Sequence, residues 1–472
     1  MKQPLIIVVG VILTAGIVTS GFYWNKQRRL AATIQAHLLP PPSFKGLHPE
    51  LGNRIAELNK RTTEGPNRVE SLAELSSLYH ANGYLSRAWQ NYRILIELDD
   101  KNPLWPYRLA TIVSSFGHLD DSVALYRNAI KLDSEYTPTN IHLGDTLLKL
   151  NRYEQAQHAY QSAYDKDPSN PFALFGLARV ALTRDETKIA QRLLESARRS
   201  NKRIGGDLLA DVYETLGEMS KARALLHDVT WSSHIDIPDP WIDDLVSVCY
   251  DSFEVAMAGG KAGRRGNTTR AIELLKKAIS LDPLDQNAHN HLAETYVAHG
   301  NLNQARLAYE ACIKVSPTFD RGWAGLISVE LKSGNQSRAS QLIDQAIAKC
   351  PSSYVINNYK GEDLIKKTLF REAIPFFETS VRAAPEKAVG YNYLARAYLN
   401  LGENGKALKH LQRALKNEPS NPLSIKLITI FYVLAEEPAQ ARAFLRKAVL
   451  SPRISEEDIA QLQAMFDEKF KL

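Results

Sequence analysis

The sequence predicts an all-α solenoid of about eleven helix-turn-helix units, preceded by one transmembrane helix. Three observations carry this prediction. A small residue recurs through most of the chain, nearly always at intervals of 34 residues. A large apolar or aromatic residue follows each small residue four positions later, which is one helical turn, so both lie on one helix face. Glycine and proline recur at fixed offsets between these positions, where helices must end. The recurring small residues are Ala88, Ser122, Ala156, Ala190, Ala222, Ala271, Ala305, Ala339, Ala373, Ala407 and Ala441.

The positions of glycine, proline and further small residues indicate a pair of helices in each unit. Seven units carry a glycine five residues before the small position, where the first helix turns into the second. Six carry a proline twelve residues after it, where the second helix ends. Eight carry a second small residue twelve positions earlier, which lets the two helices approach closely. The turn glycines are Gly83, Gly117, Gly217, Gly266, Gly300, Gly334 and Gly402.

These residues resemble the tetratricopeptide repeat (TPR), a 34-residue helix pair with small, aromatic and proline positions at these spacings. Trp323 stands at the tryptophan position of that family, and leucines such as Leu326 and Leu394 stand at its leucine position. The resemblance implies a right-handed superhelix whose concave groove is lined chiefly by first helices. The eleven units begin near Val69, Pro103, Thr137, Pro171, Arg203, Ser252, Gln286, Asp320, Tyr354, Ala388 and Pro422.

The chain divides in order into seven segments. A single repeat cannot bury its apolar face alone, so the stacked units need capping helices at both ends. Residues 230–251 carry no repeat pattern, so we expect an irregular elbow between two arrays. The predicted segments are a membrane anchor (1–29), a proline-containing spacer (30–47), a capping helix (48–68), a five-unit array (69–229), the elbow (230–251), a six-unit array (252–454) and a second capping helix (455–472).

The N-terminus has the features of a signal anchor. Residues 4–24 contain no charge and are mostly apolar. At about 1.5 Å per residue they cross a hydrocarbon core of about 30 Å. Phe22, Tyr23 and Trp24 form an interfacial aromatic group, and basic residues follow. The alternative is a cleaved signal peptide, but the apolar run is longer than a usual one, so we favour the uncleaved anchor.

Two features of the sequence bear on the side of the membrane on which the body lies, and they point in opposite directions. The basic residues after the span favour a cytoplasmic body by one charge. The stiff spacer Pro40-Pro41-Pro42 is of the sort that holds an exported domain away from a membrane. On balance we expect a single-pass protein of the bacterial inner membrane with a periplasmic body.

No motif points to an enzyme, a cofactor or a metal. Cys249, Cys312 and Cys350 are far apart and form neither a disulfide framework nor a metal knuckle. The glycine-rich run 259–266 follows no strand and lacks the Lys-Ser or Lys-Thr of a phosphate-binding loop. The aspartates of the elbow lack the spacing of a calcium-binding EF-hand loop, and a helix capped by Asp239 before Pro240 explains part of them.

The candidate working surface is the groove of the second array. An asparagine side chain offers a donor and an acceptor, so it can bind the backbone of an extended peptide. Three asparagine-led pairs lie one helical turn apart on the family's register, although each asparagine falls one position before the family's usual one. Solvated helix-face amides are the alternative explanation. The pairs are Asn290 and Glu294, Asn358 and Glu362, and Asn392 and Arg396.

Charge suggests what this groove binds. The whole chain carries a formal charge of only +6, which argues against a dedicated nucleic-acid binder. Residues 320–455 carry 20 Lys plus Arg against 12 Asp plus Glu, a net +8. Arg321, Lys332, Lys366 and Arg396 project towards the groove on the family's register, so an acidic peptide is a fitting ligand. A solvated basic face is the alternative.

Two functions from different classes follow. The first is a non-catalytic, membrane-tethered scaffold or adaptor that binds an extended segment of a protein partner or assembles a complex. The second is a regulatory subunit of a separately encoded enzyme, such as a glycosyl transferase or a protease. Co-purification with an active enzyme distinguishes them.

Overall fold

The computed structural model describes residues 28–45, 48–227 and 236–470. The predicted transmembrane span, residues 4–24, lies outside the described residues. No helix among the described residues is both long enough and apolar enough to span a bilayer. Residues 28–37 are helical and carry Ile34, which is buried in the first core cluster.

The described chain is α-helical, as predicted, and divides into two compact units. Unit 1 comprises the chain up to Thr183 together with Ile237–Glu254. Helices α2 to α9 follow one another along it, and a later short segment adds α13 and the 3-10 helix η1. Their bounds are α2 Pro49–Glu64, α3 Arg68–Ala81, α4 Leu85–Leu98, α5 Leu104–Ser115, α6 Leu119–Leu132, α7 Thr137–Lys149, α8 Tyr153–Lys166, α9 Pro171–Leu182, α13 Pro240–Asp243 and η1 Asp244–Val248.

Unit 2 comprises Arg184–Asp236 and Val255–Leu472. Its helices are α10 Thr187–Ser200, α11 Gly206–Thr215, α12 Met219–Leu226, α14 Ser252–Arg264, α15 Thr268–Leu281, α16 Gln286–Ala298, α17 Leu302–Val315, α18 Asp320–Lys332, α19 Gln336–Lys349, α20 Tyr354–Lys366, α21 Phe370–Ala383, α22 Ala388–Asn400, α23 Asn404–Asn417, α24 Pro422–Leu434, α25 Pro438–Leu450 and α26 Glu456–Phe470.

The division between the units follows contacts, not repeat counts. It falls within the predicted five-unit array and assigns most of the predicted elbow to unit 1. The grouping of repeats into arrays of five and six therefore stays a prediction. The first helices themselves begin within three residues of the predicted unit starts; α11 is the furthest, because it starts at Gly206 instead of Arg203.

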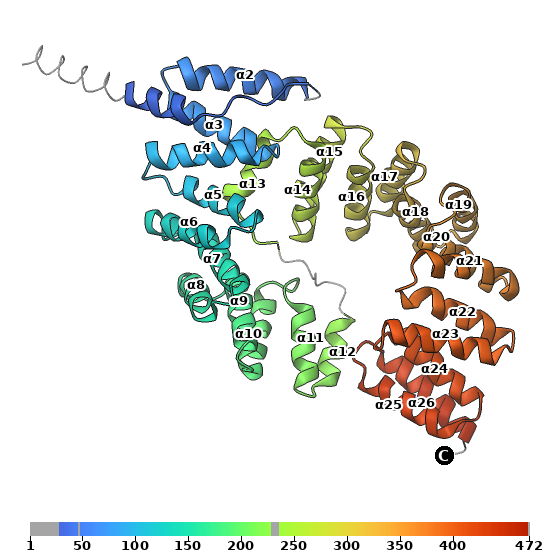
Figure 1. The fold of residues 1–472 in the computed structure, drawn as a ribbon. Coiled ribbons are helices and arrows are strands. Elements are labelled where there is room, and N and C mark those ends of the chain that lie inside the picture. Colours follow the sequence, from blue (N-terminus) through green and yellow to red (C-terminus); the bar gives the residue numbers. More distant parts are fainter. Residues whose placement is uncertain (1–27, 46–47, 228–235, 471–472) are drawn as a thin grey trace, which may run out of the picture. The chain divides into compact units, whose positions relative to one another are not determined.

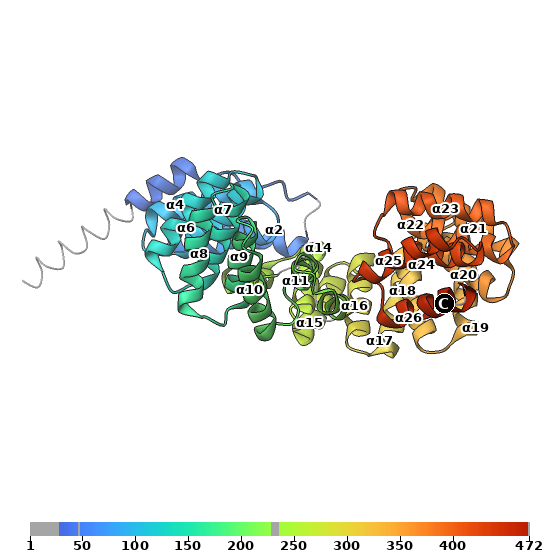
Figure 2. The ribbon, with the colours of Figure 1, turned by 90° about the horizontal axis from the view of Figure 1, so that it is seen from below.

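The helices pack in pairs, and small residues let them do so. Figures 1 and 2 both show α22 and α23 side by side, and these two helices contact one another extensively. At the equivalent place in the pair of α20 and α21, a Cβ added to Gly361 would lie 2.2 Å from the Phe377 ring. The recurring small residue Ala407 and the large residue Leu411 are both fully buried. The period of 34 residues therefore repeats one packing contact, as the sequence predicts.

Candidate peptide-binding faces

The predicted asparagines of unit 2 are buried and mostly engaged within the fold. Asn290, Asn358 and Asn392 are 2%, 8% and 1% exposed. The Asn290 Nδ2 donates to Glu294 Oε1 at 2.8 Å. The Asn392 side chain donates to Asn421 Oδ1 at 3.1 Å and accepts from the Ser424 hydroxyl at 2.8 Å.

Asn358 has a buried acceptor that is not used within the described chain, because its Oδ1 has no hydrogen-bond partner there. Asn392 instead supports the start of α24, because Asn421 caps that helix by accepting from the Ser424 N–H. A row of three asparagines that binds a peptide backbone therefore stays a prediction.

The charged members of the predicted set lie nearer to solvent. Arg321, Lys332, Lys366 and Glu294 are exposed, whereas Glu362 and Arg396 are half-buried. Lys332 and Lys366 are the last residues of α18 and α20, where a cation also favours the helix dipole. The interaction with the helix dipole is thus a structural explanation for both lysines.

Two tyrosines that the sequence analysis did not single out complete this surface. Tyr359 and Tyr393 occupy the same repeat position, directly after Asn358 and Asn392. Burial raises the pKa of both hydroxyls, and the neighbouring Glu362 carboxylate raises it further. Their shared 34-residue offset was the signal that could have identified them. We call Glu294, Arg321, Tyr359, Glu362, Tyr393 and Arg396 the polar face of unit 2.

The polar face is electrostatically connected. Although Glu294 is exposed, its neighbours exclude part of the water around the carboxylate and so raise its pKa, but the hydrogen bonds from His291 and Asn290 and the charge of Arg321 outweigh this effect. The pKa of Glu294 therefore lies below its usual range, and this carboxylate is charged at neutral pH. The face alternates charges and aromatic rings, which suits an extended peptide better than a small molecule.

A second face lies on unit 1, and part of the chain already covers it. Helix α13 contacts α5, and η1 contacts α3, although more than 100 residues separate them in the sequence. Figure 1 shows α13 beside α5. We call Ile237–Tyr250 the resident segment. It contacts a group of side chains that we call the aromatic face of unit 1: Asn82, Tyr107, Arg108, Tyr136 and His142.

The elbow aspartates have a different role from the predicted one. Asp239 precedes α13, but its side chain makes no cap hydrogen bond, so that interpretation is wrong. Its carboxylate instead accepts from the hydroxyls of Tyr107 and Tyr136, at 2.5 and 2.7 Å. No group of three or more potential metal ligands occurs among the described residues.

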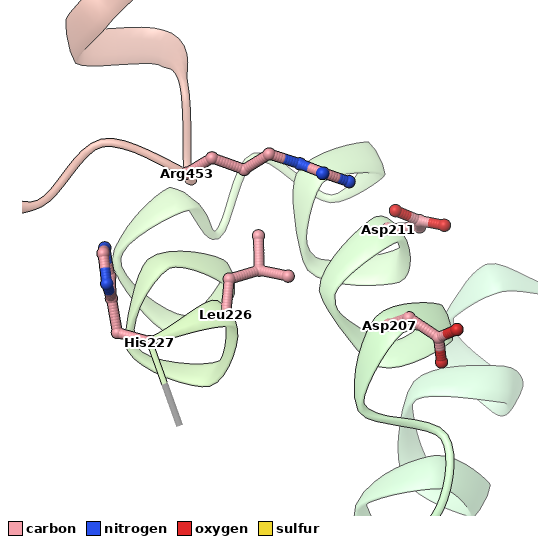
Figure 3. A pocket seen from close by; sticks show the side chains of 5 residues that line it. All are labelled: Asp207, Asp211, Leu226, His227 and Arg453. Carbon is pink, nitrogen blue, oxygen red and sulfur yellow. The ribbon is translucent and has the colours of Figure 1, made fainter. Parts of the chain in front are cut away.

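A third feature is a hollow of about 410 Å³ in unit 2. It is lined by Asp207 and Asp211 of α11, by Leu226 and His227 at the end of α12, and by Arg453, whose side chain extends towards Asp211 (Figure 3). Burial and the Asp207 charge raise the pKa of Asp211, and Arg453 lowers it only partly.

Contacts beside this hollow are structural. Arg223 donates to the Val449 carbonyl at 2.9 Å and to Glu456 at 3.3 Å, across 226 and 233 residues of sequence. These bonds connect α12 to the helices at the C-terminal end of unit 2. The hollow therefore borders a packing contact, and we do not treat it as a binding site.

Family models of the tetratricopeptide repeat match residues 142–188, 264–311, 292–354 and 388–421. These segments of the chain are tetratricopeptide repeats. The matched segments lie on both units, and they include α16 to α18 and α22, which carry much of the polar face. Proteins with such repeats are typically non-catalytic and bind protein or peptide partners.

Similar proteins share the repeat and differ widely in length. Cellulose synthase operon protein C of Pseudomonas fluorescens is 23% identical over 56% of this chain and 21% of its own length. Tetratricopeptide repeat protein 21A of Mus musculus is 24% identical over 58% of this chain and 20% of its own length. The rat DnaJ homolog subfamily C member 3 is 20% identical over 85% of this chain and 68% of its length. The TPR protein thus spans only about a fifth of the first two.

Two solved structures are similar to the chain at low TM-scores. Yeast Tom70 covers 86% of this chain and 96% of its own at 13% identity, with a TM-score of 0.38. PilF of Pseudomonas aeruginosa covers 45% and 98% at 20% identity, also with a TM-score of 0.38.

Proposed function

We propose that this TPR protein is a non-catalytic, membrane-tethered scaffold whose unit 2 binds an extended, acidic segment of a partner protein. The observation that carries the proposal is the polar face, where charged side chains lie at or near solvent beside two half-buried tyrosines, one of which, Tyr393, also stacks on the core residue Phe377. Arg321 is exposed and Arg396 half-buried, and both stand on first helices.

The charge balance of this surface favours an acidic ligand. Arg321, Arg396, Lys332 and Lys366 outnumber the two carboxylates, and the segment around them is basic overall. Tyr359 and Tyr393 offer rigid contact area at low entropic cost, so they suit a peptide that lies across successive helices. The tether supplies the second half of the proposal: residues 4–24 would hold the scaffold at a membrane surface.

A crosslinking experiment in cells tests the binding face. The photoreactive amino acid p-benzoylphenylalanine replaces Tyr393 on α22, or, as the control, exposed Gln412 on α23. We expect one protein to be crosslinked from position 393 and not from position 412, because the partner lies on first helices. Equal crosslinking from both positions would contradict the proposal.

A matched pair of charge reversals tests the acidic partner. Arg396→Glu places a negative charge on the polar face, whereas Arg413→Glu makes the same change at an exposed position of α23. The first should reduce crosslinking from position 393 at least tenfold, since like charges then oppose one another. The second should leave it within twofold. Equal losses would show that net charge, and not this face, governs capture.

A further inference from the structure

We propose that the aromatic face of unit 1 is a second protein-binding site, distinct from the polar face. It takes a partner segment with an Asp-Pro-Trp core, and the resident segment holds the site until such a partner displaces it. The argument rests on three kinds of contact: a carboxylate site, an aromatic slot and a backbone clamp.

The carboxylate site binds Asp239. This side chain is only 5% exposed, and it accepts from the hydroxyls of Tyr107 and Tyr136. The His142 Nε2 lies 3.3 Å from the same carboxylate. Burial raises the pKa of Asp239, but these three neighbours outweigh it and hold the pKa below its usual range. A buried carboxylate is tolerated only where it is paired in this way, so the face selects an acidic residue here.

The aromatic slot binds Trp241. Its ring stacks on Tyr136 with centroids 3.6 Å apart and an interplanar angle of 6°. Tyr107 meets the same ring edge-on, at 5.1 Å and 82°. Tyr136 thus stacks on the tryptophan ring, donates to Asp239 and accepts from the backbone N–H of Trp241 at 3.0 Å. Pro240 between them sets the backbone angle that starts the single turn of α13, so residue order matters.

The backbone clamp binds main-chain groups of the resident segment. Asn82 donates to the Val248 carbonyl at 3.0 Å and accepts from the Tyr250 N–H at 2.7 Å. Arg108, which is 6% exposed, donates to the Trp241 carbonyl at 2.8 Å. Bonds to main-chain groups do not depend on the side chains of the ligand, so a foreign segment can make them equally well.

The resident segment fills the face incompletely. A hollow of about 280 Å³ lies between Val248 and Tyr250 and the helices α2, α3 and α5, and its lining includes Leu58, Leu78 and Trp105. The resident segment competes through its covalent tether, which gives an effective concentration of about millimolar order. A partner that also fills this hollow gains contacts that the resident segment lacks.

A competition assay tests the proposal on the purified full chain. The probe is a fluorescein-labelled peptide that copies residues 236–251, with serine in place of Cys249. We expect Trp241→Ala to bind it at least tenfold more tightly than the unaltered chain, in fluorescence anisotropy, because the resident segment then competes poorly. Adding Tyr136→Ala to that variant should abolish binding.

An isosteric pair controls for charge and folding. Asp239→Asn weakens the carboxylate contact, whereas Asp244→Asn makes the same change at an exposed position of the resident segment. The first should raise peptide affinity and the second should leave it within twofold. If neither Trp241→Ala nor Asp239→Asn binds the peptide more tightly while both keep their helical content, the segment is a fixed part of unit 1 and the proposal is wrong. A dimer that Trp241→Ala dissolves, seen by light scattering, would instead assign the face to a second copy.

Discussion

The turn between the two helices of each repeat places one residue in the left-handed region. The seven predicted turn glycines all have positive φ, between 72° and 86°. The four repeats without a turn glycine place Asn151, Asp185, Thr368 and Glu436 at the same position, with φ between 56° and 60°. The fold therefore imposes this conformation whatever residue occupies it. Asparagine and aspartate tolerate it, but a β-branched threonine does so at a cost.

Thr368→Gly should stabilise the protein. The left-handed conformation costs a non-glycine residue about 1–2 kcal/mol, and the greater freedom of glycine in the unfolded chain offsets about 0.5–1 kcal/mol of the gain. We expect a net gain of about 0.5–1 kcal/mol in the free energy of unfolding, measured by urea denaturation. The reciprocal change Gly334→Thr should lose at least as much. Stabilisation by both changes, or by neither, would show that the turn conformation is not what governs stability here.

At the scale of helices, polar contacts link successive elements where the sequence pattern shows only helix faces. Glu330 of α18 is 2% exposed, and its carboxylate accepts from Arg306 of α17 at 2.5 Å and from Asn335, which precedes α19, at 2.7 Å. Burial raises the pKa of Glu330, but the two hydrogen bonds and the Arg306 charge outweigh it and lower the pKa overall. One carboxylate thus joins three consecutive helices.

Glu330→Gln should destabilise unit 2 in a pH-dependent manner. A buried acceptor that loses its charge costs about 1–3 kcal/mol at neutral pH. Because the folded pKa is lowered, the stabilisation by Glu330 is present above the unfolded pKa of about 4.3 and is lost as the pH falls through the folded value. The variant and the original protein should therefore converge in thermal stability at acid pH. Exposed Glu386→Gln is the control, and a constant difference across the titration would contradict the carboxylate's role.

The element scale also shows what the sequence could and could not predict. The 34-residue period predicted the helix pairs and their starts. It could do so because the same contact between neighbouring helices, such as that of Gly361 with Phe377, recurs in each repeat and requires the same residue types there. It could not predict that Trp241 stacks on Tyr136, since that contact joins residues of unrelated pattern about a hundred positions apart. The aspartates of the elbow stand out in the sequence, but composition alone cannot distinguish a helix cap from a carboxylate bound by tyrosines.

The same limit applies to the candidate site in unit 2. The register placed Arg321 and Arg396 on first helices, and the structure has them there near solvent. It did not reveal that Asn392 bonds to Asn421 and Ser424 of the next repeat. An asparagine side chain on a helix can face the following helix pair or the solvent. A shift of one position along the helix, such as that of these asparagines from the family's usual position, changes which of the two it faces.

For the whole molecule, the membrane tether is the prediction with the largest consequence. Deleting residues 1–24 removes the apolar segment and spares the helix at residues 28–37, whose Ile34 is part of the unit 1 core. We expect the shortened protein to leave the membrane fraction and to keep its helical content by circular dichroism. A matched variant with Val8→Arg and Ile12→Arg keeps the length and should behave alike, because two charges in the span oppose insertion. Recovery of either variant with membranes would mean that another surface binds lipid.

Because contacting residues of unit 1 are far apart in the sequence, they are synthesised at different times. Tyr107 leaves the ribosome 132 residues before Asp239, its partner in the carboxylate site. At about 5–20 residues per second, the nascent helices wait about 7–26 s for the rest of their contacts. Once His142 has also been made, the aromatic face stands open on the nascent chain until Asp239 follows. A partner translated nearby would therefore meet the face without having to compete, so the order of translation can decide which segment occupies it first.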